Sequence, residues 1–212
     1  AAEDRAEVTL TVNTAGEPWT GEQTTLNLDL KTPALTFAEI HFDLPEVAGA
    51  LLLRTDSTTV KLSERRDGTT WQVLRYPITL FAQQAGELTV PAFEVRFKTQ
   101  AGYGTEQTRH HLLTEPLVLT VRQPPGLAVG TVLVTTPEHE LAFDSSLTAK
   151  PIQAGDAITL TVERRAVGLS AMLLPSLPVF ETEVLAAYPA APRIDDRTNR
   201  GSLVGERTDR MT

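Results

Sequence analysis

The segment Thr25-Leu26-Asn27-Leu28-Asp29-Leu30 alternates leucine with polar side chains, and this period of two decides the fold class. Successive side chains of a β-strand point to opposite faces, so such a segment buries its leucines and exposes its polar residues. The same alternation recurs along the chain in residues 8–12, 40–42, 93–97, 117–121 and 158–162. We therefore predict an all-β chain of antiparallel sheets, each with one buried face and one wet face.

Turn signals separate the alternating segments. Asp67-Gly68 lies between two of them and predicts a β-hairpin closed by a two-residue turn. Pro77 and Pro91 fall inside strand-like segments. Because proline has no N–H to donate to a sheet, we place both at edges, bulges or strand starts. No segment keeps a helical period, and residues 168–174 offer at most a single helical turn.

The length of 212 residues fits two domains, because domains of roughly 100 residues are common. Gln123-Pro124-Pro125-Gly126 is the clearest boundary, since proline and glycine interrupt the strand pattern there. We expect a first immunoglobulin-like β-sandwich over residues 1–123, a linker over 124–130, and a second immunoglobulin-like β-sandwich over 131–212. The second sandwich is expected to open with a strand near Thr131.

A faint internal repeat relates the two halves. Gly21-Glu22 and Gly155-Asp156 each stand shortly before a Thr-Leu strand entry. In the first half a Gly-Glu-Leu-Thr-Val-Pro motif starts at Gly86, and the same spacing counted in the second half runs past residue 212. We therefore expect the second sandwich to be truncated, lacking its closing strands or receiving them from a partner chain. Either case leaves an open edge for strand addition.

Composition excludes several classes of function. The chain has no cysteine, which rules out disulfides, iron–sulfur clusters and cysteine-based zinc sites. Its net charge is −8, and an acidic chain lacks the basic face that nucleic acids require. No apolar stretch approaches the ~20 residues that span a bilayer. The first residues, Ala1-Ala2-Glu3-Asp4, are typical of an exported chain after removal of its signal peptide.

Two groups of polar residues are candidate cation sites. His139, flanked by Glu138 and Glu140, is a candidate surface zinc ligand, and the competing interpretation is an exposed polar loop. Asp195-Asp196 lies in a segment of mixed charge. There a cation site competes with a solvated hairpin that turns at Thr198-Asn199-Arg200-Gly201.

Motifs of catalysis are not apparent in the sequence. Gly168-Leu169-Ser170-Ala171-Met172 lacks the closing glycine of a nucleophile elbow, and no histidine follows it. Gly102-Tyr103-Gly104 has no helix after it, as a phosphate loop requires. Among the few aromatic residues, we expect Trp71 in the core. Trp19 is either an exposed interface anchor or packed against its own domain.

Four segments of the sequence, taken in their order along the chain, form a set of motifs. They are Gly21-Glu22-Gln23; the run from Tyr76-Pro77 to Val90-Pro91; Gly168-Leu169-Ser170-Ala171 with Leu174-Pro175-Ser176-Leu177-Pro178; and Tyr188-Pro189 followed by Asp195-Asp196-Arg197 and Gly205-Glu206-Arg207-Thr208. Together this ordered set, which spans most of the chain, resembles the BatD family of oxygen-tolerance, or aerotolerance, proteins.

The resemblance implies the periplasmic ectodomain of a bacterial inner-membrane protein, built of β-sandwich domains ahead of a C-terminal membrane anchor. Such proteins are encoded beside a MoxR-type AAA+ ATPase and proteins with von Willebrand factor A domains, in systems linked to envelope stress or oxygen tolerance. We therefore expect a non-catalytic scaffold or adaptor without a cofactor, whose partners are von Willebrand factor A domain proteins. Because this sequence has no membrane span, it resembles the ectodomain alone.

The candidate partner-binding residues are Trp19, Glu138, Glu140, Asp195 and Asp196. An aromatic side chain can anchor an interface, and an exposed carboxylate can complete the metal site of a von Willebrand factor A domain. The alternative function is a carbohydrate-binding or adhesin β-sandwich, for which Trp19, Tyr103 and Tyr188 would have to form an exposed platform. A hydrolase with two carboxylates in a cleft is a third hypothesis, for which the sequence offers no motif.

Overall fold

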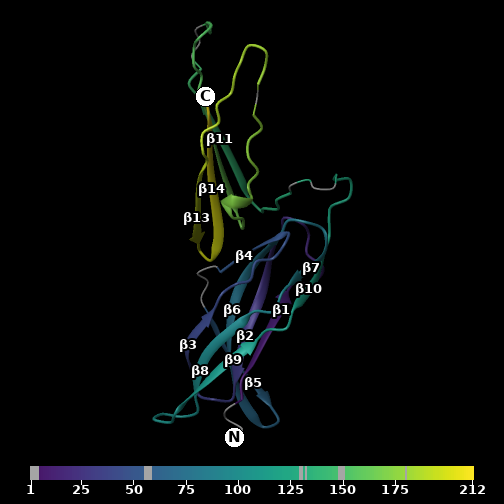
Figure 1. Cartoon of the computed structure of the whole chain (residues 1–212), viewed down its shortest axis with the longest axis vertical. Helices are drawn as coiled ribbons and strands as arrows, with labels where there is room; N and C mark the ends of the chain where they lie inside the picture. The colour runs from purple at the N-terminus through teal and green to yellow at the C-terminus, as the bar shows by residue number, and fades with distance from the viewer. Residues whose placement is uncertain (1–4, 55–58, 129–130, 132, 148–150, 180) are drawn as a thin grey trace. The chain divides into compact units, whose positions relative to one another are not determined.

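The computed structural model describes residues 5–54, 59–128, 131, 133–147, 151–179 and 181–212. Nearly all regular structure in these residues is β-strand, and every strand pair is antiparallel (Figure 1). The prediction of an all-β fold is therefore confirmed. The chain divides into two compact units, Ala1–Leu133 and Val134–Thr212.

The described residues of the first unit form three sheets. The largest has the order β1 (Glu7–Asn13), β2 (Gln23–Thr32), β6 (Thr69–Ala82) and β4 (Ala50–Leu53), and β5 (Val60–Arg66) also pairs with β6. The second has the order β3 (Thr36–Phe42), β8 (Glu94–Gln100) and β9 (Gln107–Leu113). The third pairs β7 (Gly86–Val90) with β10 (Leu117–Val121).

The core of the first unit draws side chains from all three sheets. Leu26, Leu28 and Leu30 of β2 are fully buried, as their alternation predicts. They belong to the same cluster as Val95 of β8 and Val90 of β7, so the sheets enclose one hydrophobic core. Burying each leucine contributes about 2 kcal/mol, which explains why this unit needs no disulfide.

Strand β6 is central to the first unit, and two predicted features lie on it. Asp67 and Gly68 form the two-residue turn between β5 and β6 with φ of 48° and 80°, the left-handed values that this hairpin turn requires. Pro77 pairs with β2 on one side. On its other side the described residues of β5 end their pairing at Arg75, and those of β4 begin theirs at Thr79. No described residue pairs with Pro77 on that side, as expected for a residue that has no N–H to donate.

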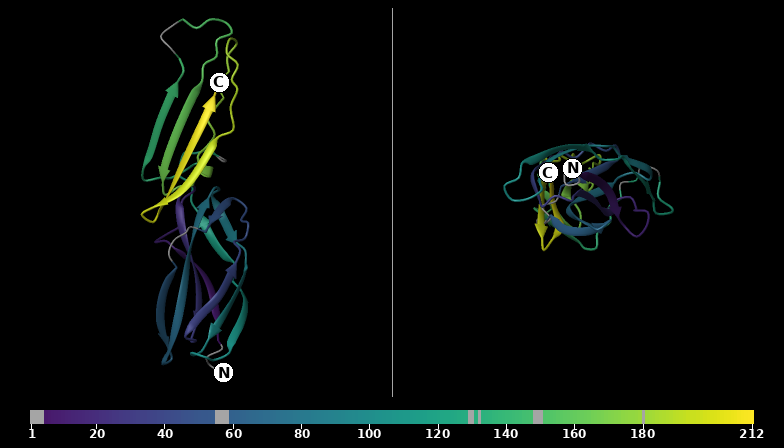
Figure 2. Two further views of the ribbon diagram at one scale, coloured as in Figure 1. Left: turned by 90° about the vertical axis from the view of Figure 1, so that its left-hand side faces the viewer. Right: turned by 90° about the horizontal axis from the view of Figure 1, so that it is seen from below.

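The second unit forms one four-stranded sheet in its described residues. The order is β11 (His139–Ser145), β12 (Leu160–Val167), β14 (Ser202–Met211) and β13 (Arg193–Asn199), with β11 and β13 at the two edges (Figure 2). A one-turn 3-10 helix, η1 (Ala171–Leu173), lies in the segment where a single helical turn was predicted. A turn was predicted at Thr198-Asn199-Arg200-Gly201. Arg200-Gly201 closes the β13–β14 hairpin with φ of 49° and 83°, while Thr198 and Asn199 belong to β13.

Two expectations about the second unit are wrong. Thr131 lies outside any strand, and the first described strand of this unit is β11, which begins at His139. The interpretation of His139 as a loop residue is also wrong, because His139 is the first residue of β11. The alternation Glu140-Leu141-Ala142-Phe143-Asp144 was available as a strand signal, but the prediction placed the first strand of this domain near Thr131, directly after the linker. That a partner chain supplies further strands stays a prediction.

Candidate functional site

The loop after β12 contacts β13 and β14 on one face of the second sheet, which we call the inner face. Ser170 donates from its hydroxyl to the Asp196 carboxylate at 2.5 Å, and the Ala171 N–H donates to the other oxygen of the same carboxylate at 2.7 Å. Ser170 also caps η1 by accepting from the Met172 N–H. Asp196 therefore ties the loop that carries η1 to strand β13.

Gly205 of β14 allows this loop to lie directly on the sheet. A Cβ at position 205 would stand 2.3 Å from the Ala171 nitrogen and 2.6 Å from the Leu169 carbonyl oxygen. No side chain fits such a space, because both neighbours are main-chain atoms. The glycine of the Gly205-Glu206-Arg207 motif is thus required by close packing rather than by a turn.

A buried ion cluster lies further along the same face. Asp209 contacts Arg164 at 2.7 Å and Arg207 at 2.8 Å, and all three side chains are at most 13% exposed. Arg207 also donates to the Leu174 carbonyl, and Arg164 donates to the Pro175 carbonyl. Burial by itself raises the pKa of Asp209, but the hydrogen bonds from the two arginines outweigh it and lower that pKa below its ordinary value.

These contacts give the loop after β12 a structural role. The Ser170 side chain is fully buried and is engaged with Asp196, so no substrate reaches its hydroxyl in this structure. Asp209 is neutralised by two guanidinium groups. The cluster stabilises the loop against the sheet, and its chemistry is that of ion pairs held away from water.

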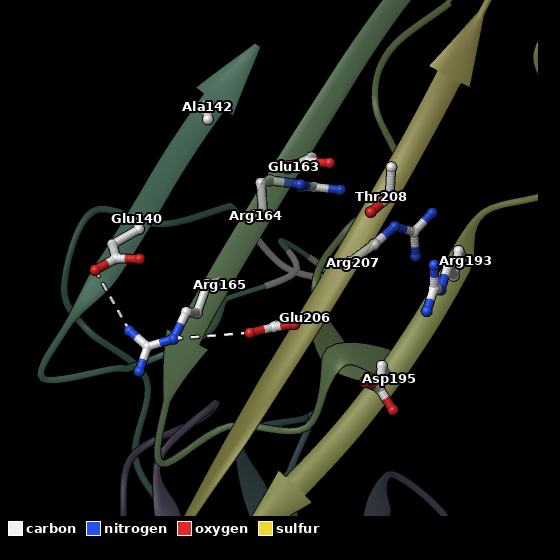
Figure 3. A pocket seen from close by; sticks show the side chains of 10 residues that line it. All are labelled: Glu140, Ala142, Glu163, Arg164, Arg165, Arg193, Asp195, Glu206, Arg207 and Thr208. Carbon is white, nitrogen blue, oxygen red and sulfur yellow. Dashed lines mark ion pairs between the residues drawn. The ribbon is translucent and has the colours of Figure 1, made fainter. Parts of the chain in front are cut away.

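The opposite, outer face of the sheet carries many charged side chains, which are exposed or half-buried (Figure 3). Arg165 of β12 lies between Glu140 of β11, at 3.4 Å, and Glu206 of β14, at 3.9 Å. Glu206 also pairs with Arg197 of β13. A hollow of about 330 Å³ follows these side chains, lined among others by Glu163, Arg193, Asp195 and Thr208.

Strand β11 has an unpaired edge. Within the described part of the second unit it pairs with β12 alone, and all seven of its residues are exposed. The Val167 N–H donates to the Glu138 carbonyl, and the Ser146 N–H donates to the Thr159 carbonyl, one at each end of β11. Because bonding alternates along an antiparallel pair, the even-numbered residues of β11 bond to β12.

The odd-numbered residues His139, Leu141, Phe143 and Ser145 therefore direct their N–H and C=O groups away from β12. We call this row of main-chain groups the free edge of β11. Leu141 and Phe143 are 54% and 72% exposed, on the same face as Arg164 and Val162, their register partners. A strand edge beside uncovered apolar side chains is able to pair with another chain.

The structure separates the predicted partner-binding residues. Glu138 and Glu140 both pair with Arg165, and Asp195 shares the outer face with them. Asp196 points to the inner face, where it binds Ser170.

Trp19 belongs to the first unit. It lies under the guanidinium of Arg122, 5.1 Å from its ring centroid, and is 37% exposed. Trp71, expected in the core, is buried.

The prediction missed Leu141, Phe143 and Arg165. The alternation around Leu141 and Phe143 indicated a strand. Whether a strand lies at the edge of its sheet depends on strand order, which the local pattern does not reveal. In the described residues no group of three or more histidine or carboxylate side chains is arranged to hold a metal ion.

Comparison with known proteins adds no relative: no protein-family model matches the chain, and no curated protein matches its sequence. Among the described residues, none forms a helix that is both long and apolar enough to cross a membrane.

Proposed function

We propose that this chain is a non-catalytic periplasmic scaffold or adaptor of the BatD type, with immunoglobulin-like sandwich domains, and that it holds its protein partner at the free edge of β11. One observation carries the proposal: within the part of the chain that the structure describes, β11 ends the sheet with unpaired main-chain groups beside the exposed side chains of Leu141 and Phe143. Strand addition uses such an edge, with main-chain hydrogen bonds supplying affinity and neighbouring side chains supplying specificity.

The inner-face contacts support a scaffold. Asp196, Gly205 and Arg207 come from the motifs that resemble the BatD family, and each fixes the loop after β12 to the sheet. A sheet held rigid in this way presents its edge in a defined geometry, which lowers the entropic cost of binding. The partners proposed are a von Willebrand factor A domain protein and, in the same system, a MoxR-type ATPase.

Site-specific crosslinking tests the proposal. A photo-crosslinking amino acid replaces Phe143, and the tagged chain is mixed with envelope extract from its own organism. A matched control carries the same group in place of Val118, which is 56% exposed on β10 of the first unit. We expect position 143, and not position 118, to capture a von Willebrand factor A protein or the ATPase. Capture of neither, or equal capture at both positions, contradicts the proposal.

The carbohydrate-binding alternative has less support in the structure. Tyr103 and Tyr188 are 94% and 71% exposed, but Trp19 is only 37% exposed and Arg122 lies over one face of its ring. Sugar platforms need an uncovered aromatic face. A glycan array that shows saturable binding, together with failed crosslinking at Phe143, would favour this alternative over the scaffold.

A further inference from the structure

The free edge of β11 has a different row of side chains on each face of the sheet. Leu141 and Phe143 form an apolar row on the inner face. Glu140 and Asp144 lie on the outer face, because side chains alternate along a strand. A strand that pairs with this edge must therefore offer matching side chains to both rows.

The outer row next to the free edge is acidic. On β11, β12 and the residue before β11, the outer face carries the carboxylates of Glu138, Glu140, Asp144 and Glu163 and the guanidinium of Arg165. Arg165 contacts Glu138 at 3.7 Å and Glu140 at 3.4 Å, which leaves an excess of negative charge. A like-charged strand is repelled there, and a basic one is attracted.

We propose that the free edge of β11 takes up a partner strand in which apolar side chains alternate with lysine or arginine. The inference rests on the proposed function and deepens it by naming the chemistry of the bound segment. The apolar residues of that strand cover Leu141 and Phe143, and its basic residues face Glu140 and Asp144. Exposed charges of this kind mainly set partner choice and association rate, while main-chain bonds and covered apolar area supply affinity.

Two synthetic peptides test the charge pattern. The first has four Lys-Val repeats, and the second has glutamate in place of each lysine; both are titrated calorimetrically into the full chain. We expect the lysine peptide to bind at least about tenfold more tightly, with a difference that shrinks as salt rises. Equal affinities overturn the basic-strand inference. If Leu141→Pro then abolishes binding of both peptides, strand addition itself still stands.

The main-chain pairing is tested by two variants at one position. Leu141→Pro removes an N–H of the free edge while the bonds of residues 140 and 142 to β12 remain. Leu141→Ala is the matched control, because it removes the same side chain and keeps the N–H. We expect the proline variant to bind the lysine peptide at least about tenfold more weakly than the alanine variant. Equal affinities overturn both the inference and strand addition at this edge.

A second pair of variants leaves the backbone untouched. Glu140→Gln with Asp144→Asn removes two charges beside the free edge, and Glu87→Gln with Glu115→Gln removes two from exposed positions of the first unit. We expect the first pair to weaken lysine-peptide binding about fivefold or more and the second to leave it unchanged. Equal effects mean that the net charge of −8 alone attracts the peptide, and they overturn the inference.

Discussion

The Asp196 carboxylate accepts a 2.5 Å hydrogen bond from the Ser170 hydroxyl, across 26 positions of the chain. Asp196 lies on the edge strand β13, and Ser170 caps η1. The bond therefore joins the loop after β12 to the far edge of the sheet. This carboxylate, which the sequence suggested as a ligand for a partner protein, has hydrogen-bond donors in its own unit.

Replacement of Asp196 by alanine is expected to destabilise the second unit. The change leaves the buried Ser170 hydroxyl and the Ala171 N–H without their acceptor, which costs about 1–3 kcal/mol. Urea unfolding of the full chain measures the loss. Asp195→Ala is the control, because Asp195 lies next to it on the outer face; its effect should stay within about 0.5 kcal/mol. Similar losses in the two variants would argue against the structural role.

Gly205→Ala should also destabilise the second unit, by about 1–3 kcal/mol, because the new methyl group meets the main chain of Ala171 and Leu169. Gly16→Ala provides the comparison, since a Cβ at position 16 meets nothing within 4 Å. Thermal unfolding of both variants distinguishes them. An unchanged midpoint for Gly205→Ala would mean that the loop after β12 does not lie on the sheet as described.

The ion cluster makes the stability of the second unit depend on pH. The folded pKa of Asp209 is lowered, so the unfolded chain takes up its proton first as the pH falls. The stabilisation is complete above the unfolded value of about 4 and is lost as the pH falls through the folded pKa. At pH 7 the free energy of unfolding of Asp209→Asn should be lower than that of the wild type, and this difference should shrink in acid. A difference of equal size at pH 7 and pH 2.5 would exclude this linkage.

Alternation along single strands was sufficient to predict the fold class. Leu26, Leu28 and Leu30 are buried as expected, and the turns at Asp67-Gly68 and Arg200-Gly201 close hairpins. These features are local, since a strand pattern and a turn need only neighbouring residues. The strand expected near Thr131 was wrong, because Thr131 lies outside any strand and the first described strand of the second unit begins at His139.

The candidate site was less predictable, because it depends on strand order. Glu140 was predicted as a candidate partner-binding residue, but its neighbours Leu141 and Phe143 become notable only because β11 is an edge strand of the described sheet. In a central strand the same two side chains and their main-chain groups would be covered. The contact between Asp196 and Ser170 likewise arises from tertiary packing between distant segments.

Amide hydrogen exchange on the full chain tests strand addition at the free edge most directly. In the free protein, the amides of residues 140, 142 and 144 should exchange slowly because they bond to β12, and those of 139, 141, 143 and 145 should exchange fast. Saturation with the Lys-Val peptide should slow the second group alone. If the peptide binds and the exchange of residues 139, 141, 143 and 145 does not change, binding lies elsewhere and the free edge is not the docking site.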